Sequence, residues 1–415
     1  MSIQVTVLGG SGVATPELSL ALREIPNRTQ PVQLVLHGRT PDKLEHVAAA
    51  ARALAGDDAL ISVRCTTDLD EALSGADYIL NQVRVGGLEA RLFDETFPQE
   101  LGIPGEETVG AGGFANALRT LPAVLATMRR AETLCPGAKV LSFVNPASLI
   151  QYAIARYTRL ETLGMCDAPV TFCENIARAL GLPLAELTID YIGMHHFGWV
   201  NGVWHRGRDL LPEALRLAEQ IAPDVDPTLV RAMGVLPGAY HPYFFHPERM
   251  LARKMGKRPR AAELIDLQAE ILNAYTNNAE PAGGPPAALR RRGARWYSVV
   301  IAPVLAALIE TAAGSQSVSR HILNVRYGST LGWLPPDAII ETPCVIQDGA
   351  CSPLGVRPLP PDVTARVQLN SLYERLVAEA IVEHDRAKAL RALALNPVIG
   401  GAAKASAVLD LVWQD

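Results

Sequence analysis

Two adjacent histidines, His195 and His196, lie in the middle of the segment YIGMHHFGWVNG, residues 191–202. An imidazole can ligate a metal ion, act as an acid or base near neutral pH, or end a strand as a polar residue. The pair alone leaves these three interpretations open. The other chemically capable residues, and the elements that position them, must decide among them.

A glycine-rich turn near the N-terminus has the composition of a nucleotide-binding site. In VTVLGGSGVATPEL, residues 5–18, a strand-like apolar run is followed by Gly9, Gly10, Ser11 and Gly12 and then by a helix-like segment. Backbone N–H groups at such a turn can hold a dinucleotide pyrophosphate. Gly10 and Gly12 fit the first two positions of the G-x-G-x-x-G fingerprint, whereas Thr15 replaces the third glycine. We expect the four turn residues to bind a dinucleotide, and a plain strand–helix turn is the alternative.

The end of the second strand leaves the choice of dinucleotide open. An acid at this position normally holds the adenosine ribose of NAD. Here the strand ends in LVLHGRTPDKL, which places Gly38 and Arg39 at that point and no acid before Asp42. We expect Arg39 to lie in the cofactor site, where it could face the 2′-phosphate of NADP.

Charged residues and glycines are interleaved in the long segment 81–122. The charges include Arg84, Arg91, Glu106 and Glu107, and the segment follows the fourth predicted strand. In a parallel sheet, ligands bind at the edge formed by the carboxyl ends of the strands. We therefore predict a ligand-binding loop here, with a charged surface loop as the alternative.

The elements around these residues alternate between strands and helices over the first 145 residues. Apolar runs predict strands and amphipathic periodicity predicts helices. Strands are expected at 3–9, 32–38, 61–66, 76–83 and 138–146, and helices at 16–25, 41–55, 69–74 and 115–134. This alternation predicts an α/β fold with a Rossmann-type, doubly wound parallel sheet.

The remainder of the chain is less regular, which predicts a mixed α+β substrate domain. We place the boundary after residue 165, giving a dinucleotide-binding domain over 1–165 and a substrate, metal-binding and oligomerisation domain over 166–415. Strands are expected at 187–194 and 197–204, helices at 261–275, 296–312, 362–383 and 401–413, and loops at 281–286 and 353–361.

Composition excludes several classes of partner. The formal net charge of −5 offers no basic surplus for nucleic acid. No apolar run approaches the roughly 20 residues that span a bilayer. Because the sequence runs straight into a predicted strand, we expect no signal peptide. The six cysteines have no framework spacing. We expect a cytoplasmic protein with reduced thiols, no nucleic-acid partner and no membrane partner.

The motifs, in their order along the chain, resemble the NAD-dependent glycoside hydrolases of family 4. That family includes 6-phospho-β-glucosidases and 6-phospho-α-glucosidases, and it departs from the two-carboxylate mechanism of most glycosidases. The resemblance covers nearly the whole chain. It is carried by the glycine turn, VRVGG (83–87), ETVGAGGF (107–114), NP (145–146), GMCDAPV (164–170), GMHHFGW (193–199) and RGARWYS (292–298).

The resemblance implies a role for each matching residue. Cys166 and His196 match the ligands of a divalent metal, typically Mn²⁺, although a thiolate and an imidazole would suit Zn²⁺, Fe²⁺ or Co²⁺ better. Asp167 matches the proton donor and Tyr240 the catalytic base, with Tyr243 as the alternative base. Substrate-binding positions are matched by Arg84, Arg91, Asn145, His195 and Arg260. Without the resemblance, Cys166 would be a core cysteine and Asp167 a helix N-cap.

These residues fit an oxidative route to hydrolysis. The cofactor would take a hydride from C3 of the sugar, and the C2 proton would become acidic enough for a base to remove it. The leaving group would depart from C1, water would add, and the hydride would return. A metal held near the C2 and C3 oxygens would stabilise the negative charge that forms between these steps.

Several features leave the substrate open. His195 stands where family members commonly have Asn, and Glu106 where they often have Gln. CDAP (166–169) is nearer the phospho-α-glucosidase form, whereas the short spacing from His196 to Tyr240 favours the β form, which we predict. An α-linked or unphosphorylated glycoside is the alternative substrate. A net dehydrogenase of the malate or lactate type and a non-catalytic sugar sensor are more distant alternatives, and a homodimer or homotetramer is expected.

Overall fold

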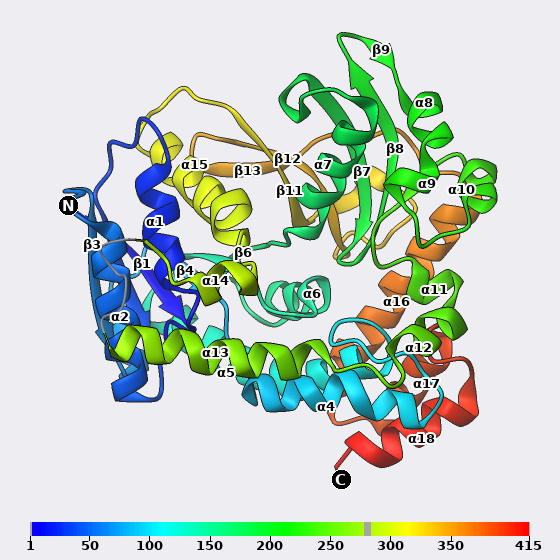
Figure 1. Cartoon of the computed structure of the whole chain (residues 1–415), viewed down its shortest axis with the longest axis horizontal. Coiled ribbons are helices and arrows are strands. Elements are labelled where there is room, and N and C mark those ends of the chain that lie inside the picture. Colours follow the sequence, from blue (N-terminus) through cyan, green and yellow to red (C-terminus); the bar gives the residue numbers. More distant parts are fainter. Residues whose placement is uncertain (1, 278–283, 415) are drawn as a thin grey trace.

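The computed structural model describes residues 2–277 and 284–414, and its first half is the predicted parallel sheet (Figure 1). Six parallel strands lie in the order β3-β2-β1-β4-β5-β6. This is the strand order of dinucleotide-binding folds, and it confirms the predicted fold class. The strands are β1 (Ile3–Leu8), β2 (Val32–His37), β3 (Ile61–Thr66), β4 (Tyr78–Asn81), β5 (Lys139–Ser142) and β6 (Glu161–Gly164).

The sheet continues beyond β6 as antiparallel strands from the second half of the chain. β11 pairs with β6 and with β12, β12 pairs with β7, and β7 and β8 form a hairpin. These strands are β7 (Leu187–Met194), β8 (Phe197–His205), β9 (Arg208–Asp209), β10 (Leu236–Pro237), β11 (Ser319–Arg326), β12 (Ile339–Gln347) and β13 (Ala350–Pro353). One sheet therefore crosses residues 165/166, and the division into two domains there stays a prediction.

Helices cover both faces of the parallel sheet, because its strands are apolar on both sides. Ile79 and Val140 pack into one core, whereas their neighbours Leu80 and Leu141 pack into the other. The first core includes α5 (Gly110–Leu134), α6 (Ala147–Tyr157), α16 (Pro361–Glu383), α17 (Arg386–Leu395) and α18 (Ala402–Val412). The second includes α1 (Pro16–Glu24), α2 (Pro41–Ala55), α13 (Arg260–Thr276), α14 (Ala287–Arg292) and α15 (Ala302–Ala312).

Most predicted elements are confirmed, but the long charged segment is not wholly a loop. Residues Gly87–Glu100 form α4, so the loop prediction is wrong over that range. The buried side of α4 carries Asp94 and Glu95 beside Leu88 and Phe97, and these acids interrupt the apolar pattern that identifies a helix. Several elements were not predicted, among them strands β6, β9, β10, β11, β12 and β13, and helices α6, α14 and α17. The loop expected at 281–286 lies partly outside the described residues.

Helix α3 (Leu69–Leu73) follows β3 and packs near β2, β3 and α5. The remaining helices surround the β7–β8 hairpin or link it to the sheet. They are α7 (Ala168–Leu180), α8 (Leu211–Arg216), α9 (Ala218–Ile221), α10 (Pro227–Met233), α11 (Pro242–Phe245) and α12 (Pro247–Lys254). Helices α8, α9, α10, α11 and α12 were not predicted either. In Figure 1 the hairpin (green) lies opposite the N-terminal strands (blue), with α6 between them. Within the described residues, no helix combines the length and apolarity needed to cross a membrane.

Candidate active site

The chemically capable residues meet where the parallel strands end. Asn145 follows β5, Cys166 follows β6, and Arg84 follows β4. The turn between β7 and β8 brings His195 and His196 to the same place, as their contacts with these segments show. This is the edge at which ligands bind in such sheets.

Cys166, His195 and His196 form a buried cluster of possible metal ligands. One ligand atom from each residue lies within 4.8 Å of the others. The three side chains belong to the end of β6 and the β7–β8 turn, so the chain fold brings the predicted pair together across thirty positions of sequence. It also adds His195, whose ring stacks on that of His196 at a centroid distance of 3.7 Å.

The histidines form a two-residue hairpin turn. Met194 pairs with Phe197 across the strands, and His196 has a left-handed φ of 60°. A left-handed backbone costs a residue with a side chain roughly 1 kcal/mol. The flanking glycines permit the close pairing, because a Cβ on Gly193 would come within 2.3 Å of the Phe197 carbonyl oxygen. A strained residue held this tightly is typical of a functional position.

The hydrogen bonds of His196 direct a lone pair into the cluster. Burial holds its pKa well below the usual value, so the ring is neutral and carries one N–H. Nδ1 lies 2.7 Å from Thr108 Oγ1, and the Thr108 hydroxyl donates to the Glu106 carboxyl group. Nδ1–H must therefore donate to Thr108, which leaves Nε2 unprotonated. A metal-ligating histidine is commonly oriented in this way by a partner on its other nitrogen.

His195 is held in the opposite tautomer. Burial lowers its pKa to about 3, so this ring is also neutral. The backbone N–H of Ala147 donates to Nδ1 at 3.3 Å, which assigns the proton to Nε2. Nε2 is buried without a hydrogen-bond partner among the described residues. In this conformation His196 presents a lone pair for a metal, whereas His195 presents a donor for an oxygen of a bound molecule.

Cys166 is a neutral thiol without a cation nearby and becomes a metal-binding thiolate only when a cation is bound. Burial, together with the nearby carboxyl groups of Glu341 and Asp167, raises its pKa well above the usual value. A coordinated cation would reverse this preference and favour the thiolate. Glu341 is itself buried, accepts hydrogen bonds from Tyr191 and Asn324, and has a pKa raised by burial to about 7. The thiol and the imidazole together fit a divalent metal and leave coordination positions for substrate oxygens.

Tyr240, and not Tyr243, contacts the cluster. Its ring stacks on His196 at 3.5 Å between centroids and 9° between planes. Burial, with the nearby acids Glu106 and Glu107 and the thiol of Cys166, holds its pKa well above the usual value. Tyr243 lies 6.3 Å beyond Tyr240. A phenolate at Tyr240 therefore requires a cation in the cluster.

Asp167 stands at the N-cap of α7, but its side chain accepts no capping hydrogen bond. The alternative structural role of a capping residue is thus not seen. Burial raises the pKa of Asp167, which favours the protonated acid. A protonated carboxyl group next to Cys166 can serve as a proton donor.

Three predicted substrate-binding residues converge on Glu107. Arg84 and Arg91 both form ion pairs with this carboxylate, the second at 2.9 Å, and the Asn145 amide donates to it at 3.4 Å. Although burial raises the pKa of Glu107, the two arginines hold it below the usual value. In the sequence, Glu107 stands out only as one of the charges of a predicted loop. Its central position was not visible, because it depends on contacts between distant segments.

Arg292 was also missed, although it belongs to the RGARWYS motif. Its guanidinium lies 5.0 Å from the Trp296 ring centroid and forms no salt bridge within the described residues. Burial lowers its pKa to about 10, and the charges of Arg84 and Arg91 act in the same direction. Arg260, a predicted substrate-binding residue, pairs with Glu263 and donates to the carbonyl oxygen of Arg292. A half-buried arginine without a carboxylate partner is a candidate anion site.

The glycine turn has the shape expected for a dinucleotide. A Cβ on Gly10 would come within 2.9 Å of Leu36 Cα, so this glycine allows the turn to pack against β2. A Cβ on Gly12 would meet only atoms of the turn itself, at 3.3 Å. Thr15 is accommodated in place of the third glycine because its hydroxyl accepts a hydrogen bond from Gln82.

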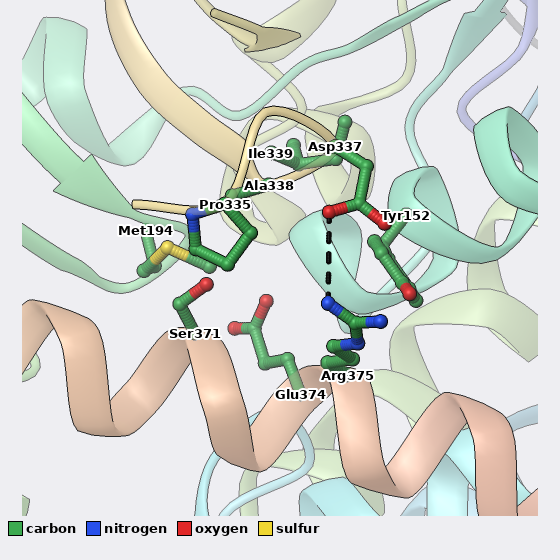
Figure 2. Close-up of a pocket in the computed structure, with 9 residues that line it drawn as sticks. All are labelled: Tyr152, Met194, Pro335, Asp337, Ala338, Ile339, Ser371, Glu374 and Arg375. Atoms are coloured by element: carbon green, nitrogen blue, oxygen red, sulfur yellow. Dashed lines mark ion pairs between the residues drawn. The ribbon is translucent and has the colours of Figure 1, made fainter. Parts of the chain in front are cut away.

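A pocket lined by both apolar and charged side chains lies beside Met194, the residue that precedes the histidine turn (Figure 2). Glu374 of α16 points into this pocket and accepts a hydrogen bond from Ser148 at 2.7 Å. Ser148 adjoins Ala147, which holds His195. Burial raises the pKa of Glu374 to about 8, and Arg375 faces Asp337 at 3.7 Å across the pocket.

Comparisons with known proteins agree with the geometry. The sequence model described as "Family 4 glycosyl hydrolase" matches residues 4–182, and that of the "Family 4 glycosyl hydrolase C-terminal domain" matches residues 191–399. A probable 6-phospho-beta-glucosidase of Bacillus subtilis is 28% identical, over 98% of this chain and 95% of that protein. A maltose-6′-phosphate glucosidase of the same organism is 26% identical, over 99% and 94%.

A solved structure agrees over the same extent. The 6-phospho-beta-glucosidase of Thermotoga maritima, determined with manganese, NAD⁺ and glucose-6-phosphate, superimposes with a TM-score of 0.88 at 25% identity. The superposition covers 98% of this chain and 97% of that one. Because the two family models together span nearly all of the sequence, the chain belongs to family 4 of the glycosyl hydrolases.

Proposed function

We propose that this glycoside hydrolase cleaves 6-phospho-β-glucosides with the help of a nicotinamide dinucleotide and a divalent metal. Cys166 and His196 would hold the metal. The observation that carries the proposal is the buried Cys166–His196 pair with Tyr240 stacked on it. The dinucleotide would supply a hydride acceptor and donor for C3 of the sugar, and the cation would stabilise negative charge on the C2 and C3 oxygens. The Thermotoga maritima relative, solved with manganese and NAD⁺, supports Mn²⁺ as the first metal to test.

The chain's own residues divide the proton transfers. Tyr240 removes the C2 proton, since a cation beside it would counteract the acids and the burial that raise its pKa. Asp167, whose pKa is raised by burial, protonates the departing oxygen. His195 orients the sugar through its unpartnered Nε2–H. Burial of the cluster keeps bulk water away from these groups.

The arginines beside the cluster favour a phosphorylated substrate. Arg84 and Arg91 are already paired with Glu107, whereas Arg292 has no carboxylate partner among the described salt bridges. We assign the 6-phosphate chiefly to Arg292, with Arg260 beside it. The relatives named above carry 6-phospho-beta-glucosidase and maltose-6′-phosphate glucosidase as names, and the β form has the higher identity.

Two further features of the proposal concern the protein's surroundings. Cys166 must stay reduced to ligate a metal, which suits a reducing compartment such as the cytoplasm. Assembly into a homodimer or homotetramer stays a prediction, as does the absence of nucleic-acid and membrane partners.

The test is hydrolysis of nitrophenyl α- and β-glucosides, with and without a 6-phosphate, by the full chain stripped of metal and nucleotide. We expect activity on the 6-phospho-β-glucoside only after a divalent cation, a nicotinamide dinucleotide and a reductant are restored. Product formed in D₂O should carry deuterium at C2. Full activity of the stripped protein, or product without deuterium at C2, would exclude the mechanism.

The same panel separates the alternatives. Preference for an α-linked or unphosphorylated glycoside would contradict the proposed substrate but would leave the proposed mechanism intact. Reduced dinucleotide accumulating in proportion to product would indicate a net dehydrogenase, and sugar binding without cleavage a sensor. Arg292→Met should raise KM for the phosphorylated substrate alone, and Arg290→Met, an exposed neighbour on α14, is the matched control.

A further inference from the structure

The end of β2 lacks the group by which a dinucleotide-binding fold recognises NAD. In such folds an acid at this point accepts hydrogen bonds from the adenosine ribose, whereas an arginine nearby accommodates the 2′-phosphate of NADP. Here β2 ends at His37 and is followed by Gly38, Arg39 and Thr40. This inference rests on the proposed function, since it concerns the dinucleotide that the glycine turn is proposed to bind.

The structure brings this segment directly beside the glycine turn. Leu8 at the end of β1 pairs with His37 at the end of β2, and Gly10 N–H donates to the His37 carbonyl oxygen at 2.7 Å. A Cβ on Gly38 would come within 2.8 Å of Ser11 Cβ. The next residue, Arg39, therefore stands next to the turn, at the position from which the acid of an NAD site reaches the ribose.

The basic side chains here are available, whereas one nearby acid is occupied and the other lies further along the chain. Arg39 is exposed and forms no hydrogen bond or salt bridge with any residue in 2–277 or 284–414. Lys43 follows in the first turns of α2 and is half-buried, with Glu89 near enough to influence its charge. Asp68 is occupied in capping α3, where it accepts hydrogen bonds from the N–H groups of Asp70 and Glu71. Asp42 is exposed in the first turn of α2, five positions after the strand ends.

We propose that Arg39, assisted by Lys43, forms a subsite for the 2′-phosphate of NADP, so that the chain binds NADP in preference to NAD. A guanidinium can donate two parallel hydrogen bonds to phosphate, and Lys43 adds a second positive charge. With no carboxylate at the end of β2, the ribose hydroxyl of NAD loses its usual acceptor. The same absence removes the repulsion that an acid would exert on the phosphate dianion of NADP.

The experiment measures nucleotide binding to the full chain without sugar or metal, so that it does not depend on turnover. Isothermal titration would compare NADPH with NADH, and 2′,5′-ADP with 5′-AMP, because each pair differs only in the phosphate. One charge-assisted contact predicts a preference of roughly 10- to 100-fold for the phosphorylated member. The preference should weaken as salt is raised, since the contact is exposed.

Variants at the subsite make the outcome specific. Arg39→Ala should abolish the preference by weakening NADPH and 2′,5′-ADP while leaving NADH and 5′-AMP unchanged, and Arg39→Asp should favour NADH. Arg52→Ala, at the far end of α2, is the matched control and should change nothing. Equal or tighter binding of NADH, or equal weakening of both dinucleotides by Arg39→Ala, would overturn the inference alone. If neither dinucleotide bound, the cofactor of the proposed function would be overturned as well.

Discussion

Thr108 has no chemistry of its own in the proposed reaction, yet it determines which nitrogen His196 offers to the cluster. Its hydroxyl donates to Glu106 and so can only accept from Nδ1 of His196, 2.7 Å away. The left-handed backbone of His196 fixes where the ring begins, and the hydroxyl fixes how the ring is turned. Replacing the Thr108 hydroxyl by a methyl group therefore tests whether this hydrogen bond orients the His196 ring.

Thr108→Val should weaken metal binding by roughly 10- to 100-fold, the usual effect of removing the hydrogen-bond partner of a ligating histidine. Thr108→Ser keeps the hydroxyl and should retain the affinity, and His196→Ala, which removes the ligand, sets the upper limit of the loss. Mn²⁺ binding can be followed by the electron paramagnetic resonance signal of free Mn²⁺. Equal affinities for the Val and Ser variants would show that the hydroxyl does not orient His196.

At the scale of elements, the Glu107 carboxylate contacts side chains from three segments: the residues before α4, α4 itself and the residues after β5. Arg84 precedes α4, Arg91 lies within it, and Asn145 follows β5, and all three direct their side chains to the one buried carboxylate. Such a cluster is costly to break by removing one partner, because buried charges are left unpaired. It serves to fix the start of α4 against the end of the parallel sheet.

Glu107→Gln should lower the free energy of unfolding by about 3 kcal/mol, since both arginines lose their shared carboxylate. The matched control is Asp70→Asn, which breaks the exposed pair with Arg130 and should leave the free energy of unfolding nearly unchanged. Urea denaturation of the full chain measures both changes. Comparable losses for the two variants would contradict a central role for Glu107.

The elements also show what sequence alone can predict. The first five parallel strands and helices α1, α2, α3 and α5 were predicted because apolar runs and amphipathic periods are local signals. Helix α4 was missed because Asp94 and Glu95 occupy its buried side, and strand β6 because its sequence, ETLG, contains only one large apolar residue. The pairing of Cys166 with His196 could be named through the family resemblance but not from spacing. The roles of Glu107, Thr108 and Arg292 could not be named at all, because each depends on burial or on a contact between distant segments.

At the scale of the whole molecule, the parallel sheet and its extension enclose two carboxyl groups that favour the neutral form. Burial raises the pKa of Glu341 to about 7 and that of Glu374 to about 8. An unfolded glutamate releases its proton near pH 4.5. These two groups therefore bind more protons in the folded chain than in the unfolded chain between about pH 4.5 and 8, and their contribution to stability falls as pH rises through this window.

Glu374→Gln should reduce this loss, because glutamine keeps hydrogen bonds to Ser148 and Asn370 without titrating. Between pH 5.5 and 8, the decline in unfolding free energy should shrink by on the order of 1 kcal/mol or more. Glu100→Gln, at the exposed end of α4, is the control and should leave the decline unchanged. An unaltered pH dependence of the urea midpoint in Glu374→Gln would show that this carboxyl group does not stay neutral on folding.

The continuity of the sheet across residues 165/166 bears on how this chain can be taken apart. A fragment ending there would leave β6 without its neighbour β11, which belongs to residues 319–326. Unpaired strand edges promote association between copies of a chain. The N-terminal segment is therefore a poor candidate for separate expression or for exchange between related proteins, even though it contains the whole parallel sheet. Recombinants should instead carry β6 and β11 from the same parent.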